Sequence, residues 1–171
     1  MKAELLTLRL IHILGGIFWV GSLMFTSFFL VPVIRSSPAA AGPVMAGLQK
    51  RRLFILLPVV ALLTIASGLR LLAIASVGFS SAYFSTPTGR TFATSAVAAT
   101  IAFLLSVFVS RPGFVRIGRL GGSLSAAPDE SARQLIAAEM QRLTQRVTIA
   151  NGLVVVLLLL AAAGMAIARY V

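Results

Sequence analysis

Four long apolar stretches constrain the fold of this sequence more than any other feature. They cover residues 5–34, 53–79, 91–110 and 147–170, and a helix needs roughly 20 mostly apolar residues to cross a bilayer. Hydrocarbon offers the backbone amides no hydrogen-bonding partners, so each stretch is predicted to be a helix. We therefore expect an all-α integral membrane protein, a four-helix bundle forming a single transmembrane domain over residues 1–171.

Composition supports this class. The chain is 58% hydrophobic and only 11% charged, against roughly 25% charged residues in a soluble domain. It has no cysteine, which excludes disulfides and thiolate metal sites. The formal net charge is +11, but the basic residues mostly flank the apolar stretches. We therefore expect the lipid bilayer, and not nucleic acid, to be their partner.

The connecting segments predict loops and one helical extension. Loops are expected from Arg35 to Arg52, where prolines and glycines recur, and from Ser80 to Arg90. The third helix is expected to stop at Arg111-Pro112-Gly113. Asp129 or Ser131 is a candidate N-cap for a helix with no breaker before Gly152. That helix is expected to run into the fourth span, giving a cytosolic helical extension on, or rising from, the membrane surface.

The distribution of basic residues predicts the orientation. With four spans, both termini and the second loop share one side and carry five basic residues, whereas the first and third loops carry ten. The positive-inside rule then puts the first and third loops in the cytoplasm. We expect a bacterial inner (cytoplasmic) membrane protein with both termini on the periplasmic side.

The single histidine is the main candidate for chemistry. His12 lies about seven residues into the first span, and an ionisable residue inside a membrane is a functional candidate by default. Arg9, His12, Gly16 and Trp19 fall on one helical face. Gly15 and Gly16 leave room beside the ring for a second helix or a flat ligand. The alternative is a neutral histidine that only bonds a neighbouring helix.

Several residues of the other spans are expected at the depth of His12: Arg70, Thr94, Ser95 and Met165. Arg70 either extends to the outer headgroups or pairs with an anionic group of a ligand. Haem iron takes axial His or Met ligands, so His12 and Met165, with Arg9 and Arg70 on the propionates and Gly16 leaving room, suit haem b. His12 and Met165 are also potential ligands for copper. A second haem-binding histidine would require a homodimer.

The sequence shows no catalytic machinery. All four acidic residues lie in flanks or loops, which argues against a proton-driven carrier. There is no phosphate-binding loop and no Ser-His-Asp set, so we expect a protein that is not an enzyme.

Four segments resemble the copper-resistance D superfamily of bacterial four-helix membrane proteins, in a poorly characterised branch. They are LRLIHILGGIFWVGSLMF, LLTIASGLRLL, STPTGRTFATSAVAATIAFLLSVFVSRP and QRVTIANGLVVVLLLLAAAGMAIARY. The resemblance implies an inner-membrane helical protein, with some members linked to copper uptake or export. It also implies kinship with membrane protoporphyrinogen oxidases, which bind haem b through a first-helix histidine corresponding to His12. Thr94 and Ser95 stand where a lysine is often seen.

Three classes of function follow from these observations. The first is a binding protein for haem b or copper centred on His12. The second is a non-catalytic accessory or structural subunit of a larger respiratory or photosynthetic membrane complex, with other membrane-protein subunits as partners. The third, ranked lowest because the residues for chemistry are missing, is a copper transporter or haem-synthesis enzyme.

Overall fold

The computed structural model describes residues 2–36, 38–125 and 127–171, and these form helices with no strand. The main helices are α1 (Lys2–Phe25), α4 (Leu53–Ala75), α6 (Pro87–Leu105) and α8 (Glu130–Ile167). The shorter ones are α2 (Val31–Ser36), α3 (Pro38–Lys50), α5 (Ser81–Phe84), α7 (Arg111–Ser125) and a terminal 3₁₀ turn η3 (Ala168–Tyr170). The prediction of an all-α chain is confirmed for this part.

Four helical stretches among the described residues are long and apolar enough to cross a membrane: Lys2–Val33, Leu53–Ala75, Pro87–Leu124 and Glu130–Tyr170. Large side chains on them remain exposed, including Ile17 at 67% and Leu160 at 62% of their surface. A soluble fold would bury such residues, whereas lipid solvates them. The four predicted stretches are therefore confirmed as apolar helices.

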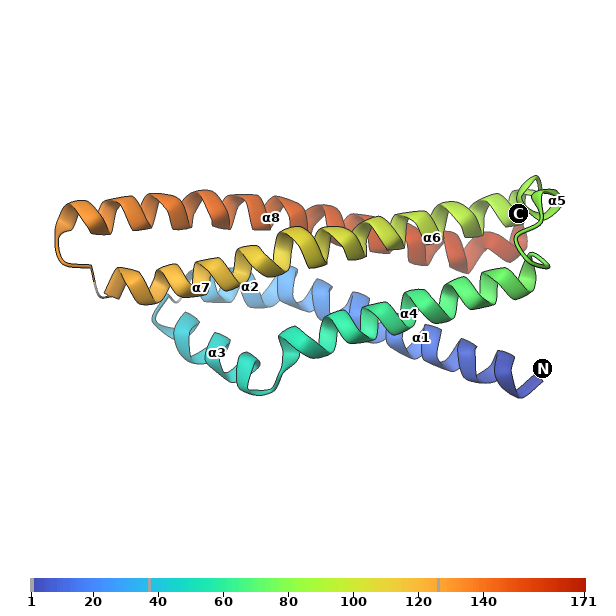
Figure 1. Ribbon diagram of the computed structural model, residues 1–171, viewed down its shortest axis with the longest axis horizontal. Helices are drawn as coiled ribbons and strands as arrows, with labels where there is room; N and C mark the ends of the chain where they lie inside the picture. Colours follow the sequence, from blue (N-terminus) through green and yellow to red (C-terminus); the bar gives the residue numbers. More distant parts are fainter. Residues whose placement is uncertain (1, 37, 126) are drawn as a thin grey trace.

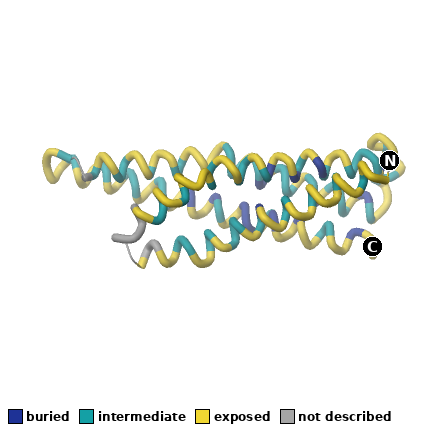
Figure 2. Tube along the Cα trace, turned by 90° about the horizontal axis from the view of Figure 1, so that it is seen from below, coloured by how far each residue is buried: buried dark blue, intermediate teal, exposed yellow. Residues whose placement is uncertain are grey.

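The four main helices associate as two antiparallel pairs, α1 with α4 and α6 with α8 (Figure 1). Both chain ends lie at one end of the molecule, and α7 with the first half of α8 forms a hairpin at the other. Buried residues concentrate where all four helices run side by side (Figure 2). Residues from all four form the core cluster: Trp19, Ala61, Ala102, Val154 and Leu158.

Two π-helical turns precede prolines, and they correct one prediction. The turns are Thr26–Leu30, before Pro32, and Ser106–Ser110, before Pro112. In each, a backbone N–H bonds the carbonyl five residues back, from Val31 to Thr26 and from Arg111 to Ser106. A proline normally collides with the carbonyl four residues earlier, and a widened turn removes that conflict.

The third long helix therefore does not stop at Arg111-Pro112-Gly113, as the sequence predicted, but continues as α7 to Ser125. Gly113 has a packing role there, because a Cβ at this position would collide with the side chain of Val147 on α8.

The two π-turns also reveal an internal repeat. They lie 80 residues apart in the sequence, and so do the prolines that follow them. Each turn belongs to the first helix of a pair, and both first helices run in the same direction (Figure 1). The described residues thus form two helical hairpins that bend at equivalent positions and lie side by side.

Other helix boundaries also differ from the prediction, and the loop expected from Ser80 to Arg90 contains α5 and the first turn of α6. The second span was expected to reach residue 79, but α4 ends at Ala75 because Val77, Gly78 and Phe79 all have positive φ and reverse the chain. The predicted first loop, Arg35 to Arg52, is mostly helical in α2 and α3. Proline is tolerated in a first helical turn, and the alanines after Pro38 favour helix.

The start of α8 confirms the predicted cap. The Asp129 carboxylate accepts a hydrogen bond of 2.7 Å from the backbone N–H of Ala132, and α8 then runs unbroken through Gly152 to Ile167. The backbone N–H of Ala132, and to a smaller extent the hydroxyl of Ser131, hold the pKa of Asp129 below its ordinary value. Arg116 on α7 forms an ion pair with Glu139 on α8, so the hairpin is joined by both packing and charge.

Candidate functional site

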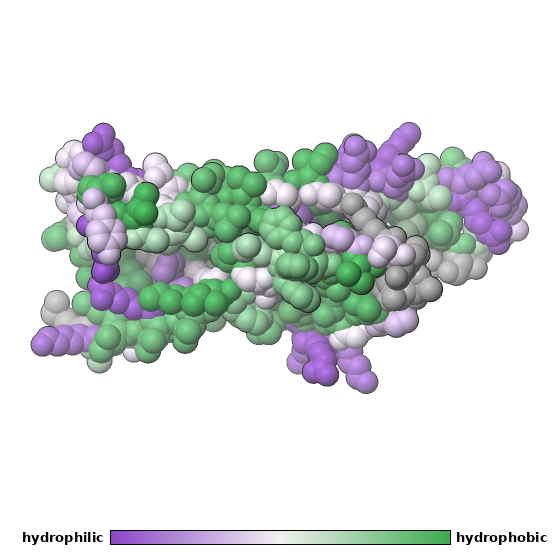
Figure 3. Space-filling view, turned by 180° about the vertical axis from the view of Figure 1, so that it is seen from behind, coloured by the Kyte–Doolittle hydropathy of each residue, from purple (hydrophilic) through white to green (hydrophobic). Residues whose placement is uncertain are grey.

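A cavity of about 1160 Å³ lies between the two helix pairs, toward the end of the molecule where the termini lie. The back view shows a hollow between the two halves at that end (Figure 3). The walls come from α1, α4, α6 and α8, with Tyr83 added from α5, and are mostly aliphatic or aromatic. The titratable or hydroxyl-bearing side chains in the lining are Arg9, His12, Thr64, Tyr83, Thr100 and Arg169.

The predicted face of the first helix borders this cavity. Arg9, His12, Gly16 and Trp19 all line it. Trp19 is 3% exposed and meets the ring of Phe103 edge-on, with 6.3 Å between ring centres. These four residues therefore border one space, and Trp19 also packs against α6.

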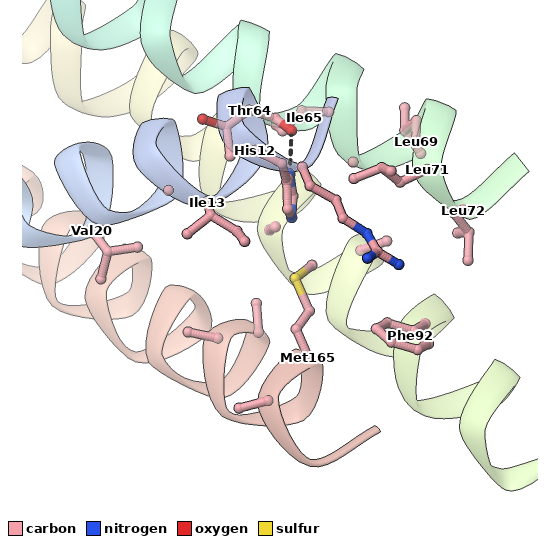
Figure 4. A pocket seen from close by; sticks show the side chains of 18 of the residues that line it. His12, Ile13, Val20, Thr64, Ile65, Leu69, Leu71, Leu72, Phe92 and Met165 are labelled. Carbon is pink, nitrogen blue, oxygen red and sulfur yellow. Dashed lines mark hydrogen bonds between the residues drawn. The ribbon is translucent and has the colours of Figure 1, made fainter. Parts of the chain in front are cut away.

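His12 is held by a backbone carbonyl of α4. Its Nδ1 lies 2.8 Å from the carbonyl oxygen of Thr64, and because a carbonyl only accepts, Nδ1 must carry the proton. In the neutral ring the lone pair then belongs to Nε2. The ring projects into the space between the helices (Figure 4). A backbone carbonyl is one of the partners, with carboxylates and water, that hold the second ring nitrogen of metal-binding histidines.

Gly68 makes room for this ring. A Cβ at position 68 would lie 2.6 Å from Cε1 and 2.8 Å from Nδ1 of His12, closer than real atoms pack. The ring therefore rests directly on the α4 backbone, which brings Nδ1 within reach of the Thr64 carbonyl one turn away. In the sequence analysis Gly68 stands only within the segment LLTIASGLRLL, with no role given to it. A histidine facing an isolated glycine on the next helix is the signal that identifies it.

The two glycines beside His12 have different roles. Gly15 faces α4, where a Cβ would collide with the Thr64 hydroxyl, so it permits close packing. Gly16 lines the cavity, and its nearest neighbour across the gap is the Thr64 methyl group at 3.8 Å from an added Cβ. Gly15 thus sets the distance between the helices, while Gly16 widens the space beside the ring.

Met165 faces His12 from the other pair. It lines the cavity, and its side chain extends from α8 toward the imidazole (Figure 4). The structure therefore brings together the predicted nitrogen and sulfur donors. Thr94 and Ser95, expected at the same depth, are outside the lining: Thr94 bonds the Arg90 carbonyl of its own helix, and Ser95 packs against Gly164.

The arginines divide differently from the prediction. Arg9 lines the cavity, but Arg70 does not; its guanidinium makes an ion pair of 2.8 Å with Glu4 on α1. Arg169, in the turn that follows α8, lines the cavity instead. Sequence reasoning counted Arg169 only as a flanking charge. Its position four residues after Met165, on the same helical face, is the signal that was available.

No group of three or more His, Cys, Asp or Glu side chains that could hold a metal ion occurs among the described residues. The nitrogen and sulfur donors in the cavity lining that the sequence analysis proposed as metal ligands are His12 and Met165. Compared with protein-family models, curated proteins and solved structures, the chain has no match. The site is therefore interpreted from its own geometry.

Proposed function

We propose that this chain is an inner-membrane protein with four spanning helices and a cytosolic hairpin. The length of α8 supports this. Its 38 residues correspond to about 57 Å at 1.5 Å per residue, while the hydrocarbon core is about 30 Å thick. All charged residues of α8 lie in its first half, between Glu130 and Arg146. That half, with α7, is proposed to extend into the cytoplasm, with both termini in the periplasm.

Single-cysteine labelling tests this orientation cleanly, because the native chain has no cysteine. Ser131→Cys, at the start of α8, and Ser81→Cys, in α5, are both at exposed positions. In intact cells a membrane-impermeant maleimide is expected to label only Ser81→Cys, and cell lysis should expose Ser131→Cys. Labelling of Ser131→Cys in intact cells would reverse the topology.

Within this protein we propose that the cavity binds haem b through His12. The observation that carries the proposal is the hydrogen bond from Nδ1 to the Thr64 carbonyl, which leaves Nε2 as the donor atom facing a large apolar space. Met165 lies across the cavity from His12, and its sulfur would be a second ligand to the iron if haem is bound. The cavity of about 1160 Å³ exceeds the roughly 300–1,000 Å³ of most small-molecule pockets. Haem, when bound, would supply reversible one-electron chemistry.

Copper receives less support from the same residues, since His12 and Met165 provide two donors and the described part of the chain holds no group of three His, Cys, Asp or Glu side chains that could bind a metal. The proposal agrees with membership of the copper-resistance D superfamily, whose haem-binding relatives use a first-helix histidine. We propose this membership on the segments quoted above, with His12 as the residue that carries it.

Absorption spectra of the protein purified gently from its native membrane test the proposal. We expect a Soret band, and α and β bands that sharpen on dithionite reduction. His12→Ala should abolish these bands. The substitution leaves the contact between Gly15 and Thr64 intact, so membrane insertion should persist. A featureless spectrum from fully folded protein, or full haem content in His12→Ala, contradicts the proposal.

A further inference from the structure

The cavity has a positively charged end. Arg9 comes from α1 and Arg169 from the turn after α8, so one arginine stands on each side of the space between the helix pairs. The lining contains no Asp or Glu. An otherwise apolar cavity with two cations and no acidic residue is complementary to a ligand that has an apolar body and a negatively charged end.

Neither arginine is paired with an acidic side chain of the described residues. No ion pair involves Arg9 or Arg169 within the described ranges. The acidic residue of α1 is Glu4, five residues before Arg9. Its carboxylate pairs with Arg70, and both residues are outside the cavity lining. The remaining acidic residues lie at the opposite end of the molecule: Asp129 caps α8, and Glu130 and Glu139 belong to it.

The two walls repeat one arrangement. On α1, Arg9 precedes His12 by three residues; on the α8 side, Arg169 follows Met165 by four residues. Because the two segments run in opposite directions, each arginine lies about one helical turn, roughly 5 Å, closer to the termini than the donor on its own wall. Two cations are thus displaced in the same direction from two facing donor atoms.

From this register we propose that Arg9 and Arg169 form a carboxylate-binding pair that orients an acidic, flat amphiphile, with its acid groups toward the chain termini and its apolar body toward Trp19. The proposal rests on the haem proposal for the ligand class, since the acid groups are then the two propionates. It differs in its residues, because it depends on the arginines and not on His12. Arg guanidinium groups bind carboxylates through paired, charge-assisted hydrogen bonds.

The test uses a ligand pair that differs only in the acid groups: metal-free protoporphyrin IX and its dimethyl ester. Trp19 is the single tryptophan of the chain and lines the cavity, so quenching of its fluorescence reports binding there. In nanodiscs of one zwitterionic lipid, the free acid is expected to bind about ten-fold or more tightly than the ester, as loss of charge-assisted hydrogen bonds implies.

Arginine variants assign this preference. Arg9→Gln and Arg169→Gln should each reduce the ratio of the two affinities toward one, while Arg169→Lys, which keeps the charge, should retain part of it. The matched control is Arg90→Gln, an exposed arginine at the same end that is outside the lining; it should leave the ratio unchanged. Equal binding of acid and ester by the native chain, or an unchanged ratio in Arg169→Gln, overturns the proposal.

The same samples separate this proposal from the haem proposal. Binding of haemin with a spectrum that depends on His12, but without any effect of Arg9→Gln or Arg169→Gln on the acid preference, would retain the haem site and reject the arginine pair. An arginine-dependent acid preference without a His12-dependent haemin spectrum would retain the pair and reject haem ligation.

Discussion

The two helix pairs close in the same way but differ in what they present to the cavity. In the α1–α4 pair, Gly15 packs against the hydroxyl-bearing side chain of Thr64; in the α6–α8 pair, Gly164 packs against Ser95. Both contacts place a glycine beneath a small polar side chain, which lets helix backbones approach closely. The Thr64 hydroxyl donates a hydrogen bond of 2.8 Å to the Val60 carbonyl of its own helix.

The pairs diverge one turn further toward the termini. On α1 a second glycine contact follows, with His12 resting on Gly68 and bonded to Thr64. The contact of Gly15 with Thr64 corresponds to that of Ser95 with Gly164, which is an offset of 80 residues in the first helix of each pair and of 100 in the second. At these offsets His12 corresponds to Phe92, which lines the cavity, and Gly68 to the fully buried Ala168. In both pairs a glycine contact packs the helices together. The α1–α4 pair has a further contact, at Gly68, that positions the His12 ring.

Substituting Gly68 should break this difference with the largest effect. Gly68→Leu puts a side chain where the imidazole lies, so His12 must leave the Thr64 carbonyl. Outer-shell partners of ligating histidines typically contribute 10–100-fold in affinity, and we expect haem affinity to fall by about 100-fold. Titration followed at the Soret band measures it. Gly21→Ala, a cavity position with no atom within 4 Å of an added Cβ, is the control and should bind normally.

The counterpart substitution in the second pair should affect stability only. An added Cβ in Gly164→Ala collides with the Ser95 hydroxyl, and overpacking costs about 1–3 kcal/mol. We expect a lower unfolding midpoint with an unchanged haem spectrum. Gly152→Ala, with open space around it on the same helix, should leave the midpoint close to that of the native chain. A spectral change in Gly164→Ala would mean that both pairs shape the site.

Met165 connects the second pair to the site, and its removal should have a smaller effect. Met165→Leu keeps the volume but loses the sulfur. Axial methionine raises the potential of a histidine-ligated haem, so we expect a lower reduction potential and a loss of affinity of about ten-fold at most. Redox titration measures the change against Met140→Leu, a methionine of α8 outside the lining. An unaltered potential would exclude Met165 as a ligand.

The smallest effect is expected at the far end of α8, where Asp129 caps the helix. Its folded-state pKa is depressed, so its stabilisation is present above the unfolded value of about 3.9 and is lost as pH falls through the folded value. Amide exchange in the first turn of α8 should therefore accelerate, relative to its intrinsic rate, as pH drops below about 4. Asp129→Ala should remove that pH dependence and leave haem binding unaffected; a persistent dependence would point to another carboxylate.

The sequence predicted the helices well and their junctions poorly. Apolar length identified four stretches, and the polar spacing around Asp129 identified the start of α8, because both are local signals. The continuation through Pro112 was missed because a π-turn depends on hydrogen bonds five residues apart, and not on composition. The end of α4 was missed because Val77 and Phe79 are apolar residues that the chain reversal holds at positive φ.

At the site, periodicity within one helix predicted the face of Arg9, His12, Gly16 and Trp19. Contacts between helices were beyond its reach. Arg70 and Arg169 are both arginines expected near the outer end of a span, and only their packing separates them: Arg70 turns to Glu4, while Arg169 borders the cavity. The role of Gly68 likewise depends on its contact with His12 on another helix, which the sequence alone does not predict.

The 80-residue repeat also makes the molecule a natural starting point for engineering. Cavity positions 12, 16, 19 and 20 of the first hairpin return as 92, 96, 99 and 100 in the second, and all eight line the same space. Phe92→His would add a second imidazole on the α6 side of the cavity. The absorption spectrum of this variant with haem would show whether the iron binds it. In that variant each hairpin would carry one imidazole among the residues that line the cavity, at positions 12 and 92.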